Sequence, residues 1–246
     1  METKPANPKS EVTTPHPLLE TMKEIVRIQQ SVNDQMAGES WIKEAVEATR
    51  VDYSWAALDE AAELWRCAVP FKFWDKSAFA MDEENARMEV VDLLHFAISQ
   101  ELANVYAANE SMSTDQRVAK VAGLMVDGMV QASQPSFEGG LRPCLKNLIH
   151  GLTHPKGNRV YWQSLFGLAS STDMKPETLV LLYKAKSVLN KFRTQMKANG
   201  KYQKIWLDYK EDNYYLTQWL SAQSTPPTEP EIMNWLVSTY RKMFSV

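Results

Sequence analysis

Apolar side chains recur every three or four residues along most of this chain, which is the spacing of one face of an α-helix. The first such run begins near Leu18, and Gly38 can end it because glycine readily leaves the helical conformation. The same pattern predicts helices over residues 18–36, 41–50, 54–68, 83–109, 115–132, 141–152, 159–171, 175–198, 211–221 and 230–244. No segment sustains the polar–apolar alternation of a half-buried strand, so the pattern predicts an all-α fold.

The pattern divides the chain into a tail and one domain. Residues 1–17 contain four prolines among Ser, Thr and Asn, and such a segment neither sustains a helix nor buries much surface. We expect residues 1–17 to form a flexible N-terminal tail and residues 18–246 to form a single all-α domain. Within that domain, residues 201–210 (KYQKIWLDYK) are expected to form an irregular loop between two helices.

Composition narrows the class of protein. The 246 residues carry 27 basic and 30 acidic side chains, a net charge of -3, which provides no general attraction for nucleic acid or an anionic membrane. No apolar run approaches the roughly 18 residues of a membrane span, and the N-terminus lacks the apolar core of a secretion signal. Two cysteines form no disulfide framework. We therefore expect an intracellular, cytoplasmic protein that binds neither nucleic acid nor membrane.

Two pairs of carboxylates stand out because apolar residues surround them. Glu60 and Glu63 lie three residues apart in LDEAAELW, and Glu89 and Asp92 lie three apart in MEVVDLLHF. On a helix, that spacing makes each pair neighbours on one face. If the two helices pack together, the four carboxylates converge and repel one another, and divalent cations would remove that repulsion. Oxygen ligands favour hard ions, so the pattern indicates a Mg²⁺ site, with Mn²⁺ as an alternative.

The second concentration of charge is basic. In YKAKSVLNKFR, Lys186, Asn190 and Arg193 follow one another at helical spacing and share one face. That face could hold a polyphosphate, or it could simply be solvated, as could either carboxylate pair. His95 lies three residues after Asp92 on the carboxylate face, where it could donate to a ligand or be an ordinary core histidine.

Taken in chain order, these segments resemble the dimeric dUTPases, a family within the all-α NTP pyrophosphatases. IQQSVND resembles the family's opening helix, with Gln30 and Asn33 in its QxxN pattern. LDEAAEL and MEVVDLLHF resemble its ExxE and ExxD helices, and VPFKFWDK resembles the aromatic turn between them. YKAKSVLNKFR and the later EDN triplet resemble its two late motifs, which favour the dUTPase branch. The resemblance implies a helical bundle of the all-α NTP pyrophosphatase type.

The resemblance also implies a role for each matching residue. Glu60, Glu63, Glu89 and Asp92 would bind magnesium. Within the first pair, our own choice for the general base is Glu60. The residues that would recognise the uracil end are Gln30, Asn33 and His95, with Phe73 and Trp74 in an aromatic lid. The residues that would contact phosphate or sugar are Lys186, Asn190, Arg193, Lys204, Lys210, Asp212 and Asn213.

A reaction and a partner follow from the same resemblance. Family members are homodimers that hydrolyse dUTP, and often dUDP, to dUMP, and the implied mechanism is attack by water that two metal ions activate. The 12 methionines and 8 tryptophans of this chain suit an apolar face that a second copy would cover. Two alternatives stay open. One is a related pyrophosphohydrolase acting on dCTP, a modified pyrimidine or a purine nucleotide, and the other is a non-enzymatic helical interaction protein.

Overall fold

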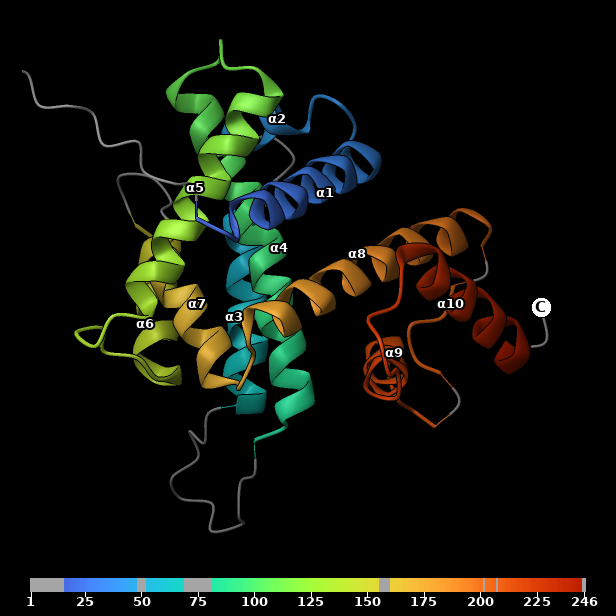
Figure 1. Ribbon diagram of the computed structural model, residues 1–246. Helices are drawn as coiled ribbons and strands as arrows, with labels where there is room; N and C mark the ends of the chain where they lie inside the picture. Colours follow the sequence, from blue (N-terminus) through green and yellow to red (C-terminus); the bar gives the residue numbers. More distant parts are fainter. Residues whose placement is uncertain are drawn as a thin grey trace, which may run out of the picture.

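The computed structural model describes residues 16–47, 52–68, 81–154, 160–200, 202–206 and 208–244. These residues form ten α-helices, which confirms the all-α prediction (Figure 1). The helices are α1 Leu19–Ala37, α2 Trp41–Glu47, α3 Tyr53–Ala68, α4 Glu83–Ala108, α5 Thr114–Ala132, α6 Leu141–Leu152, α7 Trp162–Ser171, α8 Pro176–Ala198, α9 Asp212–Ser221 and α10 Glu229–Phe244. Among the described residues, β-type pairing is limited to one isolated antiparallel bridge between Ile205 and Glu211. Ile205 lies in the expected loop, and Glu211 directly follows it.

Local signals explain where several helices begin and end. The Asp82 carboxylate accepts the backbone N–H of Asn85 and so caps the N-terminus of α4. Gly38 ends α1 with φ at 89°, a conformation that residues with a side chain disfavour. Helix α7 begins at Trp162, later than residue 159, and residues 155–159 lie outside the described part of the chain. Also outside it are residues 1–15 of the expected tail, residues 48–51, and residues 69–80 with the aromatic turn.

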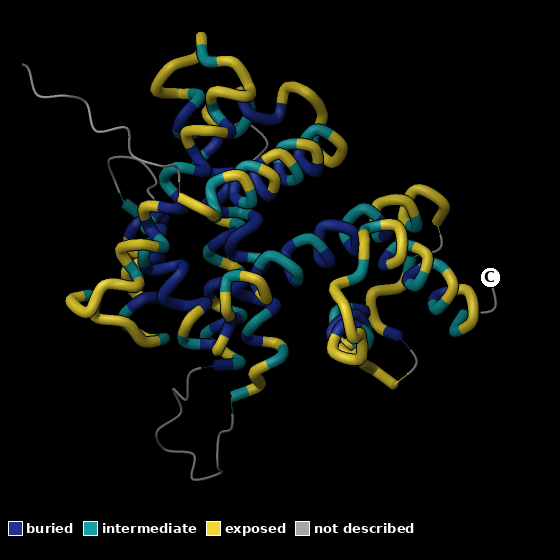
Figure 2. The backbone as a smooth tube through the Cα atoms, in the orientation of Figure 1, coloured by how far each residue is buried: buried dark blue, intermediate teal, exposed yellow. Residues whose placement is uncertain are grey.

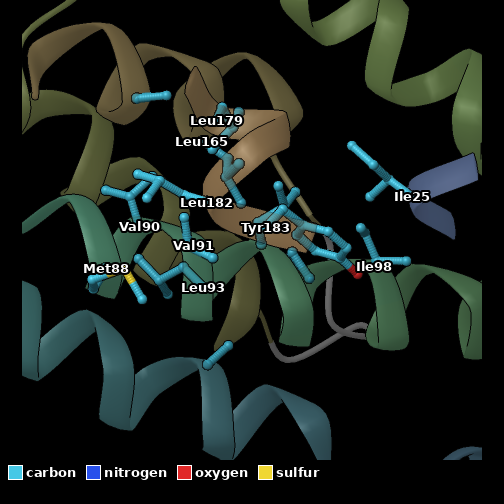
Figure 3. Close-up of a cluster of buried hydrophobic side chains, with 14 of the residues drawn as sticks. Ile25, Met88, Val90, Val91, Leu93, Ile98, Leu165, Leu179, Leu182 and Tyr183 are labelled. Atoms are coloured by element: carbon cyan, nitrogen blue, oxygen red, sulfur yellow. The ribbon is translucent and has the colours of Figure 1, made fainter. Parts of the chain in front are cut away.

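Helix α4 lies at the centre of the fold. It contacts α1, α2, α3, α5, α7, α8 and α9, so buried positions occur on nearly every face of it (Figures 1 and 2). Figure 3 shows apolar side chains of α4, among them Val90 and Val91, beside Leu182 of α8. Burial on all sides also draws polar groups of α4 inside, and Glu89 and His95 are only 6% and 4% exposed.

Helices α5, α6 and α7 form a closely packed layer against this centre. Gly128 brings α5 close to α7, because a Cβ atom at that position would lie 2.2 Å from the Cβ of Trp162. Gly167 has the same role on α7, where a Cβ would lie 2.5 Å from the Sγ of Cys144 on α6. Helices α5 and α6, which carry no recognised motif, thus supply much of this packing layer.

Helix α8 links the centre to the C-terminal helices. It packs on α1 and α4 through part of its length, and α10 and α9 contact it further along (Figure 1). This arrangement places the basic motif of α8 next to the carboxylate motif of α4. No helix in the described ranges combines the length and apolar composition needed to cross a membrane.

Candidate active site

One pocket of about 570 Å³ lies where α1, α3, α4 and α8 meet the loop that leads into α9. It contains most of the residues that the motifs singled out, although they are spread over more than 180 positions of the chain. The predicted residues that line it are Asn33, Glu60, Glu63, Glu89, Asp92, His95, Lys186, Asn190, Arg193, Lys204 and Asn213. Carboxylates from α3 and α4 therefore share one cavity with cations from α8 and the following loop.

Three of the four predicted metal-binding carboxylates form a tight cluster. Glu60, Glu63 and Glu89 each offer one oxygen, and these three atoms lie within 4.8 Å of one another. Burial, reinforced by the Asp92 carboxylate, raises the pKa of Glu60 to about 7. Burial and contact with Glu60 raise the pKa of Glu89 to about 9. The protein therefore holds these groups where negative charge is unfavourable unless a cation offsets it.

Asp92, the fourth carboxylate, is held by a lysine. Lys186 Nζ donates to Asp92 Oδ2 at 2.6 Å and to Asn213 Oδ1 at 3.0 Å. The Lys186 and Asp92 side chains are only 3% and 15% exposed. This bond joins α8 to α4 across the pocket, and it sets the acidic and basic motifs in direct contact.

Arg193 is oriented by a buried acid. Its Nη2 and Nε atoms donate to the two carboxylate oxygens of Asp212 at 2.6 and 3.0 Å, and Tyr202 donates to Asp212 at 2.6 Å. Asp212 is fully buried and is not among the residues that line the pocket. The predicted contact of Asp212 with phosphate or sugar thus has no support in its position, and its side chain instead fixes the Arg193 guanidinium.

The two loop lysines are placed differently. Lys204 lines the pocket and forms an ion pair with Glu211 at 2.8 Å. Lys210 lies in the wall of a neighbouring pocket, with Nζ 5.2 Å from the centre of the Tyr214 ring. Glu211 and Asn213 line both pockets, so Lys210 stands next to the main cavity and not within it.

A buried polar network lies at the α1 end of the pocket. His95 Nδ1 lies 2.6 Å from Gln29 Oε1, and Gln29 Nε2 donates to Asn33 Oδ1 at 2.9 Å. Burial lowers the pKa of His95 to about 4, so the ring is neutral at physiological pH. Its Nε2 atom is buried and has no hydrogen-bond partner among the described residues. An unpaired acceptor or donor at a pocket wall is a ready contact for a ligand.

The glutamine in this network is Gln29 and not the predicted Gln30. Gln30 donates from Nε2 to Asp34 at 2.9 Å and does not line the pocket. Helical spacing explains the difference, because Met22, Ile25 and Gln29 are buried on one side of α1. Phe73 and Trp74, the predicted lid residues, lie outside the described residues.

Several pocket residues had no predicted role. Tyr53 of α3 and Phe96 of α4 add aromatic surface, and Asp59 adds an exposed carboxylate at the α3 wall. Asp59 is exposed, and its position next to Glu60 on α3 brings it to the pocket.

The carboxylate cluster suits a hard divalent cation. Its donors are all oxygens, and the buried Glu89 Oε2 atom has no hydrogen-bond partner among the described residues. A cation bound there would satisfy this atom and offset the repulsion that raises the Glu60 and Glu89 pKa values. The residues at this site therefore fit a hard divalent cation.

Comparison with known proteins places the chain in a family. A family model described as dUTPase matches residues 21–198, which include most of α1, all of α2 through α8, and the carboxylate, histidine and basic motifs. The chain belongs to the dUTPase family. This is the all-α family of dimeric dUTPases that the motifs resembled, and it makes the protein a dUTP diphosphatase, a nucleoside triphosphate pyrophosphohydrolase. No curated protein matches the chain. Membership in an enzyme family contradicts the alternative of a non-enzymatic interaction protein.

Proposed function

We propose that this dUTPase hydrolyses dUTP, and also dUDP, to dUMP in a reaction that requires Mg²⁺. The observation that carries the proposal is one cavity with carboxylates on one side, cations on another and a buried amide–imidazole network at its end. These three regions suit, in turn, metal ions, a phosphate chain and a base. Mn²⁺ is the alternative ion, since it also prefers oxygen ligands.

The metal ions would be held by carboxylates of α3 and α4, namely Glu60, Glu63, Glu89 and Asp92. When bound, two such ions would acidify an attacking water and neutralise charge on the phosphate chain. Glu60 would accept the proton that this water loses, because its carboxylate faces the cavity beside Glu89. Release of dUMP corresponds to attack that breaks the link between the α and β phosphates.

The phosphate chain would lie along the basic side of the pocket. Lys186, Arg193 and Lys204 line this side, and Asn190 and Asn213 stand among them. The bidentate contact with Asp212 holds the Arg193 guanidinium in one orientation, so the group is organised before substrate binds. Donors fixed in this way would bind the leaving phosphates and offset the charge that develops on them.

The base would meet the polar network at the α1 end. Uracil presents an N–H donor between two carbonyl acceptors, and His95 Nε2 and the Asn33 amide offer an acceptor and a donor in this region. Cytosine has an acceptor in place of that N–H and an amino group in place of one carbonyl. It would therefore leave buried groups unpaired, at about 1–3 kcal/mol each. Phe73 and Trp74 would close over the base.

The test is product release from a panel of nucleotides with and without Mg²⁺. We expect pyrophosphate from dUTP and phosphate from dUDP, each only with the metal and each lost in Glu60→Gln. Faster hydrolysis of dCTP, a modified pyrimidine or a purine nucleotide would contradict the proposed base and support the alternative pyrophosphohydrolase. Turnover of dUTP in the presence of a chelator would contradict the proposed metal requirement.

The protein would act as a homodimer. Support comes from large apolar side chains left exposed near α1, α2 and α3, of which Met36 is 62%, Val46 41% and Trp55 71% exposed. Exposed apolar groups of this size in adjoining segments suit coverage by a second copy.

A further inference from the structure

Tyr183 lies directly behind the polar end of the pocket. It extends from α8 into the interior, where its side chain is fully buried and lies in the same cluster as Ile25 and Ile98 (Figure 3). Its ring stacks on His95, with ring centres 4.1 Å apart and planes at 19°. Its hydroxyl is 2.8 Å from Gln29 Oε1. Tyr183 does not line the pocket, so it can influence a ligand only through the residues that it contacts.

The Tyr183 hydroxyl must act as a donor. Burial raises its pKa well above the ordinary value, so the hydroxyl keeps its proton. Among the described residues, the structure gives this hydroxyl one hydrogen-bond partner, the side-chain oxygen of Gln29. If the Gln29 amide were reversed, its NH₂ group would face the hydroxyl and the buried proton would lose its acceptor, which is unfavourable. Tyr183 therefore holds the Gln29 oxygen in place.

That oxygen in turn determines the state of His95. A carbonyl oxygen only accepts hydrogen bonds, so the His95 Nδ1 atom 2.6 Å away must carry a hydrogen. The ring is neutral and holds one such hydrogen, so Nε2 bears a lone pair. Nε2 is buried and has no hydrogen-bond partner within the described part of the chain, in a residue that lines the pocket. The ligand consequently meets an acceptor at this point.

The hydrogen bonds of the Gln29 NH₂ group agree with this orientation of the amide. The Ser99 hydroxyl donates to the backbone oxygen of His95 at 2.9 Å, which leaves its oxygen to accept from Gln29 Nε2 and Asn33 Nδ2, both at 3.0 Å. Gln29 Nε2 also donates to Asn33 Oδ1. The NH₂ group of Asn33 has two hydrogens, and only one is used by Ser99. The second N–H has no acceptor among the described residues, so it is available to a ligand in the pocket that Asn33 lines.

We propose that Tyr183 is a positioning residue that fixes the tautomer of His95 through Gln29 and so makes the base end of the pocket select a ligand with an N–H group. The proposal rests on the proposed function, in which a pyrimidine base occupies this end. Tyr183 acts across two hydrogen bonds and touches no substrate. Tyr183 thereby disfavours the other His95 tautomer, in which Nε2 carries the hydrogen. That tautomer would donate to the unprotonated ring nitrogen of cytosine.

The test variant is Tyr183→Phe, which keeps the stacked ring and removes the hydroxyl. Nitrogen-15 spectra of the metal-free protein report which His95 nitrogen carries the hydrogen. We expect hydrogen on Nδ1 in the wild type and a mixture of both tautomers in the variant. The preference for dUTP over dCTP, as a ratio of kcat/KM values, should fall by about tenfold. Tyr106→Phe, which removes a hydroxyl of α4 outside the pocket, should change neither quantity.

The outcomes separate this proposal from the function on which it rests. Hydrogen on Nε2 in the wild type overturns the role of Tyr183 without any substrate or variant, as does an unchanged tautomer in a folded Tyr183→Phe protein. A changed tautomer with an unchanged preference overturns the link to selectivity. A wild type that hydrolyses dCTP as fast as dUTP contradicts the proposed base, and the spectra still decide what Tyr183 does.

Discussion

The Nζ atom of Lys186 on α8 lies 2.6 Å from Oδ2 of Asp92 on α4, and both side chains are nearly buried. The two residues are 94 positions apart, yet this contact joins the cationic side of the pocket to its acidic side. The Lys186 charge also opposes the effect of Asp92 on the pKa of Glu60. The pair therefore has a structural role before any substrate binds.

Removal of Lys186 should destabilise the metal-free protein. In Lys186→Met, the Asp92 carboxylate remains buried beside the other carboxylates without a cation, and loss of one partner of a buried pair costs about 3–5 kcal/mol. Urea unfolding in a chelator measures this free energy, and added Mg²⁺ should restore part of it.

Lys184→Met is the matched control for that measurement. Lys184 lies two positions before Lys186 on α8. Its Nζ atom is 2.8 Å from Glu24 Oε1, and the Lys184 and Glu24 side chains are 30% and 52% exposed. Exposed pairs of this kind contribute about 0–1 kcal/mol. Equal losses of unfolding free energy in the two variants would show that burial does not increase the contribution of the Lys186–Asp92 pair to stability.

Glu60→Gln should abolish hydrolysis while the fold survives. The substitution keeps the size of the side chain but removes both a metal ligand and the proposed base. We expect a fall in kcat of at least about a hundredfold with unchanged far-UV circular dichroism. Glu24→Gln, at an exposed position of α1, should retain full activity. Near-normal turnover of Glu60→Gln at saturating Mg²⁺ would refute the assignment.

The metal-free protein should lose stability as pH rises. The pKa of Glu60 is about 7 and that of Glu89 about 9 in the folded state, both above the ordinary value of 4.5. Between about pH 4.5 and 9 these two carboxyl groups therefore bind more protons in the folded protein than in the unfolded chain, so their contribution to the free energy of unfolding falls as pH rises. The lowered pKa of His95 opposes this trend only below about pH 6.5. Tm measured in a chelator from pH 5 to 9 records the trend.

Glu89→Gln should flatten that dependence, because it removes the group with the larger shift. At pH 8 the metal-free variant should be more stable than the wild type, and Glu24→Gln should follow the wild-type curve. A variant that keeps the wild-type slope would show that Glu89 is not the source of the pH dependence.

Local sequence signals predicted the helices well because each depends on near neighbours. Asp82 caps α4 from three residues away, and the spacing of Glu89, Asp92 and His95 places them on neighbouring turns of one helix. The family resemblance, confirmed over residues 21–198, then placed most pocket residues. The flexible tail, the single-domain division, the cytoplasmic location and the absence of nucleic-acid binding stay predictions.

Contacts between distant helices could not be predicted from spacing. The pairing of Lys186 with Asp92 depends on how α8 crosses α4. The burial of Asp212 against Arg193 depends on the path of the loop after α8. Gln29 is different, since its spacing from Met22 and Ile25 on α1 was available in the sequence. The QxxN motif drew attention to Gln30, and periodicity would have favoured its neighbour.

The protein should be a homodimer in solution. Light scattering at micromolar concentration should give twice the protomer mass of 28.1 kDa. If the exposed side of α3 lies in the interface, Trp55→Glu should shift the mass toward the monomer, because a charge cannot be buried there without a partner. Val130→Glu, at a 40% exposed position of α5, is the control and should remain dimeric. A monomeric wild type would contradict the prediction directly.

Asn33 should set base preference, and Gln30 should not. Asn33 is 5% exposed and lines the pocket, whereas Gln30 donates to Asp34 outside it. Asn33→Ala removes the N–H proposed to serve a uracil carbonyl, so the ratio of kcat/KM for dUTP to that for dCTP should fall by about ten- to a hundredfold. Gln30→Ala should leave the ratio unchanged, because its side chain is directed to a neighbour on its own helix. Equal falls in both variants would show that helix α1 influences the base only through its stability, and a fall confined to Gln30→Ala would restore the residue that the motif alone favoured.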